Sequence, residues 1–278
     1  MARLKKLGSL QPLLQRVVPF LFALLATLLT AGPAFRRRLV TSLGNQLGDV
    51  YDNLFDWRSQ TSKLEDVIEH DGMRVVVVSH GGVGTTAFVD YLQKTGVNRP
   101  GWSRNYFNVV HMPKPVTLVD PYITGRLKTI VYIFGDPLVS LCSVKRRNFG
   151  ARNLKRLGRG TGLWWWLHSD HRLLEAMYLQ FKAWTNPATR SKLGYSVLSL
   201  SHEDVFDPLC LSTLCSTLGT CKTAHNPLRQ QQRETAAESQ CVVGLEKGLW
   251  ARQREKVREM RAFAETTICA RLRRQHRD

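Results

Sequence analysis

The chain has 278 residues, of which 43% are hydrophobic, so it can bury the core of one large domain with appendages and is too short for a string of several large domains. Its formal net charge of +18 and its isoelectric point near pH 10.1 favour an anionic partner: a nucleic acid, a phosphorylated cofactor, an acidic glycan or an anionic membrane surface. Charge alone does not choose among these partners.

The N-terminal part contains a run without charged residues, residues 17–35. About 20 apolar residues span a bilayer, so this run predicts a membrane-spanning signal anchor. A cleaved signal peptide is the alternative, because the most apolar part is short and small residues follow it. Pro33 and the arginines that follow the run favour the anchor, and a buried amphipathic helix fits less well because no polar face interrupts the run. Residues 1–38 are therefore expected to form a cytosolic tail and signal anchor, although basic residues at both ends leave the orientation undecided.

All six cysteines follow this run, and an even number is compatible with disulfides in a lumen; they are Cys142, Cys210, Cys215, Cys221, Cys241 and Cys269. Reduced core residues are the alternative for Cys210, Cys215 and Cys221. No pair has the Cys-x-x-Cys or histidine spacing of a zinc site, so no metal is expected.

Residues 39–71 are polar and predict a stem or leading helix, and residues 72–278 predict the main domain. Three apolar runs predict strands of a parallel sheet, with three helices between them: strands at 73–80, 127–137 and 195–204, helices at 86–94, 138–148 and 164–184. This alternation predicts an α/β fold of three layers with a mostly parallel central sheet. Ligands of such sheets bind at the carboxyl ends of the strands, where the first two runs end in a turn that contains glycine.

Two basic segments follow. Residues 152–166, rich in glycine and cations, are expected to form an exposed loop that leads into a helix beginning with tryptophans. The segment from residue 250 has apolar residues at helical spacing and predicts a surface helix with one packed face, rather than an arm that binds nucleic acid. No nucleic acid partner is expected.

The first strand leads into a glycine-rich turn, SHGGVGTT, which contains Gly81, Gly82, Val83, Gly84, Thr85 and Thr86. Backbone N–H groups of such a turn and of the following helix point to one place and can bind an anion. The loop of nucleoside triphosphatases would have lysine where this chain has Thr85, so a kinase of that class is not expected. A tight turn without a ligand is the alternative for the glycines taken alone.

The order and spacing of these segments resemble the sulfotransferases that use 3′-phosphoadenosine-5′-phosphosulfate, over roughly residues 74–207. The family's first loop reads like Ser-Gly-Thr-Thr and binds the 5′-phosphosulfate, and Gly84 to Thr86 match it. The family's second strand ends in a motif like Arg-Asp-Pro, followed by a serine that holds the 3′-phosphate; Asp136, Pro137 and Ser143 match these positions. Glu203 and Asp204 resemble the family's acidic pair after the third strand.

His111 lies in the segment HMPKP, which resembles the Lys-Thr-His-x-Pro segment that carries the catalytic base of the family. A sulfuryl acceptor must lose a proton as it attacks, and an imidazole suits this role. His80, at the end of the first strand, is a rival base.

Two cations of the family pattern are missing, because its loop lysine aligns with Gly82 and its 3′-phosphate arginine aligns with Gly135. Possible replacements are Lys114, Lys145, Arg146, Arg147 and Lys247. Arg147 lies one helical turn after Ser143, so it is the residue expected to face the same phosphate.

The resemblance implies a P-loop-like sulfotransferase fold and transfer of a sulfuryl group to a hydroxyl of a glycan or other, possibly anionic, acceptor, without a metal. The glycine turn, Ser143 and Arg147 would bind the cofactor, and residues 164–166 would offer an aromatic platform to the acceptor unless they are core. The anchor at residues 17–35 would place the domain in the Golgi lumen. The alternative is a protein of this fold that has lost activity and serves as a binding or scaffold module at a membrane.

Overall fold

The computed structural model describes residues 60–98, 109–147, 149–158, 169–218 and 236–267, and the single residues 32, 106, 269 and 270. Apart from residue 32, all of these belong to one compact unit, Asn53–Asp278. The expected membrane anchor, residues 17–35, lies outside the described residues except for residue 32. None of the described helices has the length and apolar content that a bilayer crossing requires.

The centre of the fold is a parallel sheet of three strands, β1 (Val75–Ser79), β2 (Thr129–Phe134) and β3 (Val197–Ser201), in the order β1-β2-β3. Every residue of β1 and β2 is buried, which explains why their sequences are unbroken apolar runs rather than alternating ones. The predicted α/β class and the parallel sheet are confirmed at the three predicted positions.

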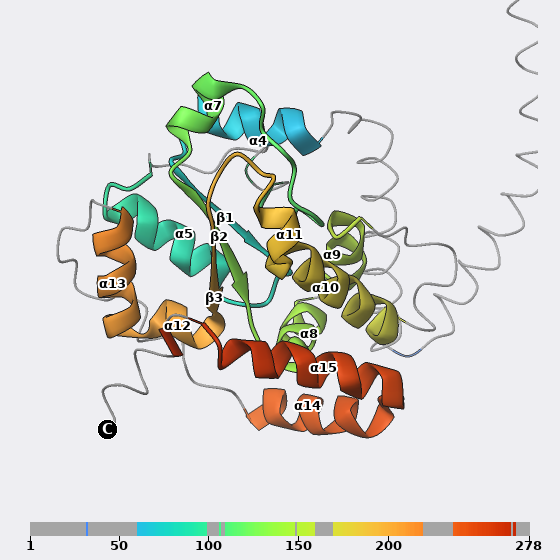
Figure 1. Cartoon of the computed structure of the whole chain (residues 1–278). Helices are drawn as coiled ribbons and strands as arrows, with labels where there is room; N and C mark the ends of the chain where they lie inside the picture. The colour runs from blue at the N-terminus through green and yellow to red at the C-terminus, as the bar shows by residue number, and fades with distance from the viewer. Residues whose placement is uncertain are drawn as a thin grey trace, which may run out of the picture. The chain divides into compact units, whose positions relative to one another are not determined.

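Helices lie on both faces of this sheet (Figure 1). To one side lie α5 (Thr85–Lys94) and α13 (Pro208–Leu218), and to the other lie α9 (Gly150–Arg156), α10 (Ser169–Thr185) and α11 (Pro187–Arg190). The described helices are α4 (Gln60–Glu69), α5 (Thr85–Lys94), α7 (Pro121–Arg126), α8 (Pro137–Arg146), α9 (Gly150–Arg156), α10 (Ser169–Thr185), α11 (Pro187–Arg190), α12 (His202–Phe206), α13 (Pro208–Leu218), α14 (Ala236–Gly248) and α15 (Ala251–Ala264). The helices predicted after the first and second strands are thus present as α5 and α8.

The prediction of an exposed loop at residues 152–166 is wrong for the first part of this segment, because α9 continues to Arg156. Leu154 and Leu157 pack with Leu141 of α8 and Met177 of α10 in a separate apolar cluster. This packing stabilises the helix despite the glycine at its start. The three tryptophans at 164–166 lie outside the described residues.

Local signals in the sequence explain where the central helix α8 begins. Pro137 stands at its first position, and Asp136 Oδ1 accepts the N–H groups of Leu138 and Val139 at 2.8 and 3.2 Å. The other Asp136 oxygen accepts a hydrogen bond from Arg261 of α15 at 2.5 Å. The start of α8 is therefore fixed by its own cap and by a distant helix.

Two disulfides join segments that are far apart in the sequence. Cys142 of α8 bonds to Cys241 of α14, across 99 residues, and Cys210 of α13 bonds to Cys269, across 59 residues. The alternative of a reduced core cysteine is therefore wrong for Cys210. The side chains of Cys215 and Cys221 lie outside the described part of the chain.

Candidate functional site

A pocket of about 370 Å³ opens at the carboxyl end of β1. The glycine turn and the start of α5 form one side, Val110 and His111 another, and the end of α8 with α9 the third. The pocket contains seven of the residues singled out in the sequence: Gly81, Gly82, Gly84, Thr85, Thr86, His111 and Arg147. The structure therefore brings the glycine turn, the candidate base and one candidate cation to one place.

The first turn of α5 is available to an anion. Gly84 precedes it with φ 68°, no described side chain caps the helix, and Thr85, Thr86 and Ala87 of its first turn line the pocket. The Thr85 hydroxyl lies 2.6 Å from Ser79 Oγ, which also accepts the Gly81 N–H at 3.2 Å. Ser79 thus ties the turn to the end of β1.

The two positions that lack the family's cations are closely packed. A Cβ atom at Gly82 would lie 2.6 Å from the Ser140 carbonyl oxygen, and Gly82 has a φ of +77°. A Cβ atom at Gly135 would lie 3.0 Å from Val83 Cγ1. A lysine does not fit at Gly82, since the backbone of α8 packs directly on the turn there, and a side chain at Gly135 would need Val83 and His202 to shift. Val83, which the sequence also predicts at the anion site, is buried and is not among the lining residues.

Two guanidinium groups line the pocket, from Arg147 and Arg156. Arg147 donates to Ser143 twice, from Nε to the carbonyl oxygen at 3.2 Å and from Nη2 to Oγ at 3.3 Å. Ser143 does not line the pocket itself, so it holds Arg147 at the rim instead of touching the pocket directly.

The sequence did not indicate that Arg156 and Asn153 on α9 belong to the site. Asn153 is buried, donates from Nδ2 to the His80 carbonyl oxygen at 2.7 Å, and lies against Gly81. Their spacing of three residues places both on one helix face, which is the signal that a helical assignment of this segment would have used. Phe149 and Asp90 also line the pocket, and Asp90 brings a carboxylate to a site that is otherwise cationic.

The other proposed cations lie elsewhere. Lys145 forms an ion pair with Asp170 at 2.7 Å. Lys114, Arg146 and Lys247 are exposed, and none of them is among the described residues that line this pocket.

His111 is partly buried at the pocket wall. Its Nδ1 lies 3.0 Å from the Ser79 carbonyl oxygen, which only accepts, so Nδ1 carries the hydrogen and Nε2 keeps a lone pair. Burial, together with the positive charges of Arg156 and Arg147, lowers the pKa of His111 to about 4, against the opposing effect of the Ser79 hydrogen bond. The imidazole is neutral at pH 7 and has a free lone pair at Nε2, but its lowered pKa makes it a weaker base than an imidazole that titrates near neutrality.

The rival base, His80, lies beneath the turn. It is fully buried, its Nε2 lies 3.1 Å from Ser140 Oγ, and it is not among the lining residues. Burial, and to a lesser degree the nearby His111, lowers its pKa to about 3. It supports the turn rather than the pocket.

In the acidic pair after β3, Asp204 has a structural role. Asp204 accepts the Ser201 N–H at 2.7 Å and Ser201 Oγ accepts the Asp204 N–H at 3.3 Å, which forms a capping box at the start of α12. Glu203 is exposed.

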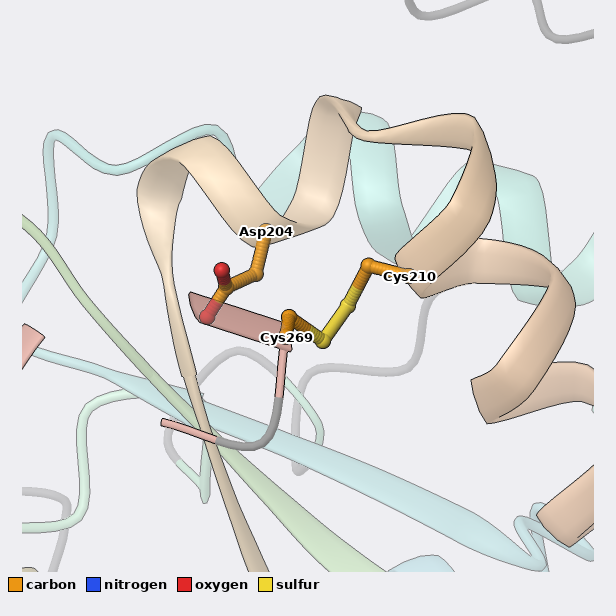
Figure 2. A group of neighbouring side chains, drawn as sticks. All are labelled: Asp204, Cys210 and Cys269. Carbon is orange, nitrogen blue, oxygen red and sulfur yellow. A yellow bond between two sulfur atoms is a disulfide. The ribbon is translucent and has the colours of Figure 1, made fainter. Parts of the chain in front are cut away.

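Asp204 also lies beside the Cys210–Cys269 disulfide (Figure 2). A carboxylate oxygen and the two sulfur atoms lie within 4.8 Å of one another, a distance that suits metal ligands. The sulfur atoms are bonded to each other and are not thiolates, so this group does not ligate a metal in the disulfide form.

Comparison of the chain with protein-family models, with curated proteins and with solved structures found no significant match.

Proposed function

We propose that this pocket binds 3′-phosphoadenosine-5′-phosphosulfate and that the protein is a sulfotransferase of a P-loop-like fold acting on a hydroxyl of a glycan or another acceptor. One observation carries the proposal: a glycine turn with an uncapped helix start, two arginines and a neutral histidine line a single pocket.

The described residues fit an anionic nucleotide. The N–H groups at the start of α5 carry partial positive charge, and the Arg147 and Arg156 guanidinium groups add full charges beside it. These arginines supply the charge that Gly82 and Gly135 lack. Phe149, a residue that is 45% exposed, brings an aromatic side chain to the same pocket.

The bound cofactor would supply a sulfuryl group to the acceptor oxygen, with adenosine 3′,5′-bisphosphate as the leaving group. His111 takes the hydroxyl proton at Nε2, because Nδ1 already donates to Ser79. Burial, together with the positive charges of Arg156 and Arg147, keeps His111 neutral.

A lumenal location, with residues 17–35 as a signal anchor and the Golgi as the compartment, is part of the proposal. The two disulfides support it, because such bonds persist in oxidising compartments and are rare in the cytosol.

The test is calorimetric binding of adenosine 3′,5′-bisphosphate to the full chain and to Arg147→Gln and Arg156→Gln variants. Each variant is expected to weaken binding about 10-fold or more, since it removes a charge-assisted hydrogen bond worth about 1.5–3 kcal/mol. Arg258→Gln on α15 is the matched control, because this exposed arginine pairs with Glu255 and does not line the pocket. Absence of binding to the folded chain at millimolar nucleotide would refute the proposal.

A second candidate is a protein of this fold that binds without catalysis, as a scaffold module at a membrane. The tight packing at Gly82 favours it, because no lysine can reach the leaving oxygen from that position. Bisphosphate binding without transfer of labelled sulfate to any glycan or peptide hydroxyl would identify this case.

A further inference from the structure

We infer that Gln180 of α10 is a positioning residue for His111: its side-chain amide fixes the carbonyl group that orients the histidine ring. This inference rests on the proposed function, in which His111 is the base. Gln180 lies outside the pocket lining and outside every motif of the sequence.

The contacts of Gln180 enclose the histidine segment. Its Nε2 donates to the Ser79 carbonyl oxygen at 3.2 Å and to the Met112 carbonyl oxygen at 2.7 Å. The Met112 oxygen also accepts the indole N–H of Trp184 at 3.0 Å, and the Ser79 N–H donates to the Val110 oxygen at 2.7 Å. The backbone on either side of His111 is thus held to the end of β1 and to α10.

The amide can take only one orientation. Two carbonyl oxygens face it, and only its NH₂ group can donate to both. Its Oε1 atom is buried and has no hydrogen-bond partner within the described part of the chain. A buried amide oxygen is left unpaired here so that the two carbonyl groups are held, which indicates that their position matters.

The Ser79 carbonyl oxygen accepts hydrogen bonds from both Gln180 Nε2 and His111 Nδ1. It sets the Nδ1–H tautomer, whereas neutral imidazole free in water favours the other tautomer, with hydrogen on Nε2. Only the Nδ1–H form presents a lone pair at Nε2. Gln180 therefore acts on the candidate base through Ser79, without touching the pocket.

The alternative is that Gln180 only satisfies two buried carbonyl groups and stabilises the fold. Trp184 supplies the comparison, because it donates to Met112 but not to Ser79. A merely structural role predicts the same tautomer of His111 in Gln180→Met and Trp184→Phe variants, whereas a positioning role predicts a change in the first alone.

The experiment is long-range ¹H–¹⁵N NMR of the histidine rings in the full chain at pH 7, with a His111→Gln variant to identify the His111 signals among the eight histidines. The wild type is expected to show mainly the Nδ1–H form. Gln180→Met is expected to lower the ratio of Nδ1–H to Nε2–H about fivefold, the equivalent of one hydrogen bond. Trp184→Phe is expected to leave the ratio unchanged.

If the wild type shows the Nε2–H form, the inference is overturned without any variant. The inference can therefore be tested even if the Gln180→Met protein does not fold. An unchanged ratio in folded Gln180→Met, or an equal fall in Trp184→Phe, also overturns it. The tautomer is read without a nucleotide. Failure of the proposed function, seen as absent bisphosphate binding, is therefore distinct from failure of this inference.

Discussion

Gly82 shows how one residue can exclude the cation that the family pattern requires. Its φ of +77° is matched by Gly96 at +76°, but a Cβ atom at Gly82 would meet Ser140 at 2.6 Å, while one at Gly96 would meet nothing within 4 Å. Comparing substitutions at these two glycines therefore separates the effect of backbone strain from that of steric exclusion.

Gly96→Ala is expected to lower the free energy of unfolding by about 1–2 kcal/mol through its φ alone. Gly82→Ala is expected to lose about 1–3 kcal/mol more, since α8 must move. Urea denaturation of both variants measures the difference. Equal losses would show that α8 yields easily and that a lysine at position 82 is permitted.

Single residues also show how far the sequence predicts the candidate site. Gly81 and Thr85 of the glycine turn, His111 of the segment HMPKP and Arg147, one helical turn after Ser143, are predicted site residues, and they lie around one pocket. Arg156 was missed, because a segment rich in glycine and cations resembles a solvated loop. What makes it a helix is burial of Leu154 and Leu157 against other helices, which a local pattern does not contain.

The strands were predictable as elements because burial on both faces leaves no alternation in their sequences. The contacts of α8 could not be predicted from the sequence. Its cap and start follow from Asp136 and Pro137, but its partners, α14 through a disulfide and α15 through Arg261, come from about 100 or more residues later. Such pairing depends on tertiary structure.

The disulfides provide a test of α8 as the support of the pocket. In the chain-entropy view, closing loops of 99 or 59 residues stabilises the fold by about 4–5 kcal/mol in each case. Replacing both cysteines of either pair by serine is expected to lower the free energy of unfolding by a similar amount.

Bisphosphate affinity is expected to fall only for the Cys142–Cys241 pair, because Cys142 lies on α8, the helix that Arg147 caps. The Cys210–Cys269 variant is the control. Calorimetry of the two serine variants decides the matter, and equal affinities would show that α8 holds its place without the bond.

The stability of the whole molecule is expected to depend on pH through two histidines. The pKa of His80 is lowered to about 3 and that of His111 to about 4, from 6.5 in the unfolded chain. Between pH 6.5 and 4 the unfolded chain therefore binds protons that the folded chain does not. The free energy of unfolding falls as the pH falls through this window, by up to about 1.4 kcal/mol per pH unit for each histidine.

His80→Gln is expected to remove about half of this slope between pH 5 and 6.5, where carboxylates contribute little. Urea denaturation across that range, compared with the wild type, measures it. Identical slopes in the two proteins would mean that His80 is protonated in the folded state, against its burial.

The two disulfides interleave along the chain, in the order Cys142, Cys210, Cys241 and Cys269. At about 5–20 residues per second, the ribosome delivers Cys241 roughly 5–20 s after Cys142, and Cys210 arrives in between as a competing thiol. Neither native bond can form before Cys241 emerges. Biosynthesis of this protein should therefore depend on an enzyme that reshuffles mispaired cysteines, more than its size alone would suggest.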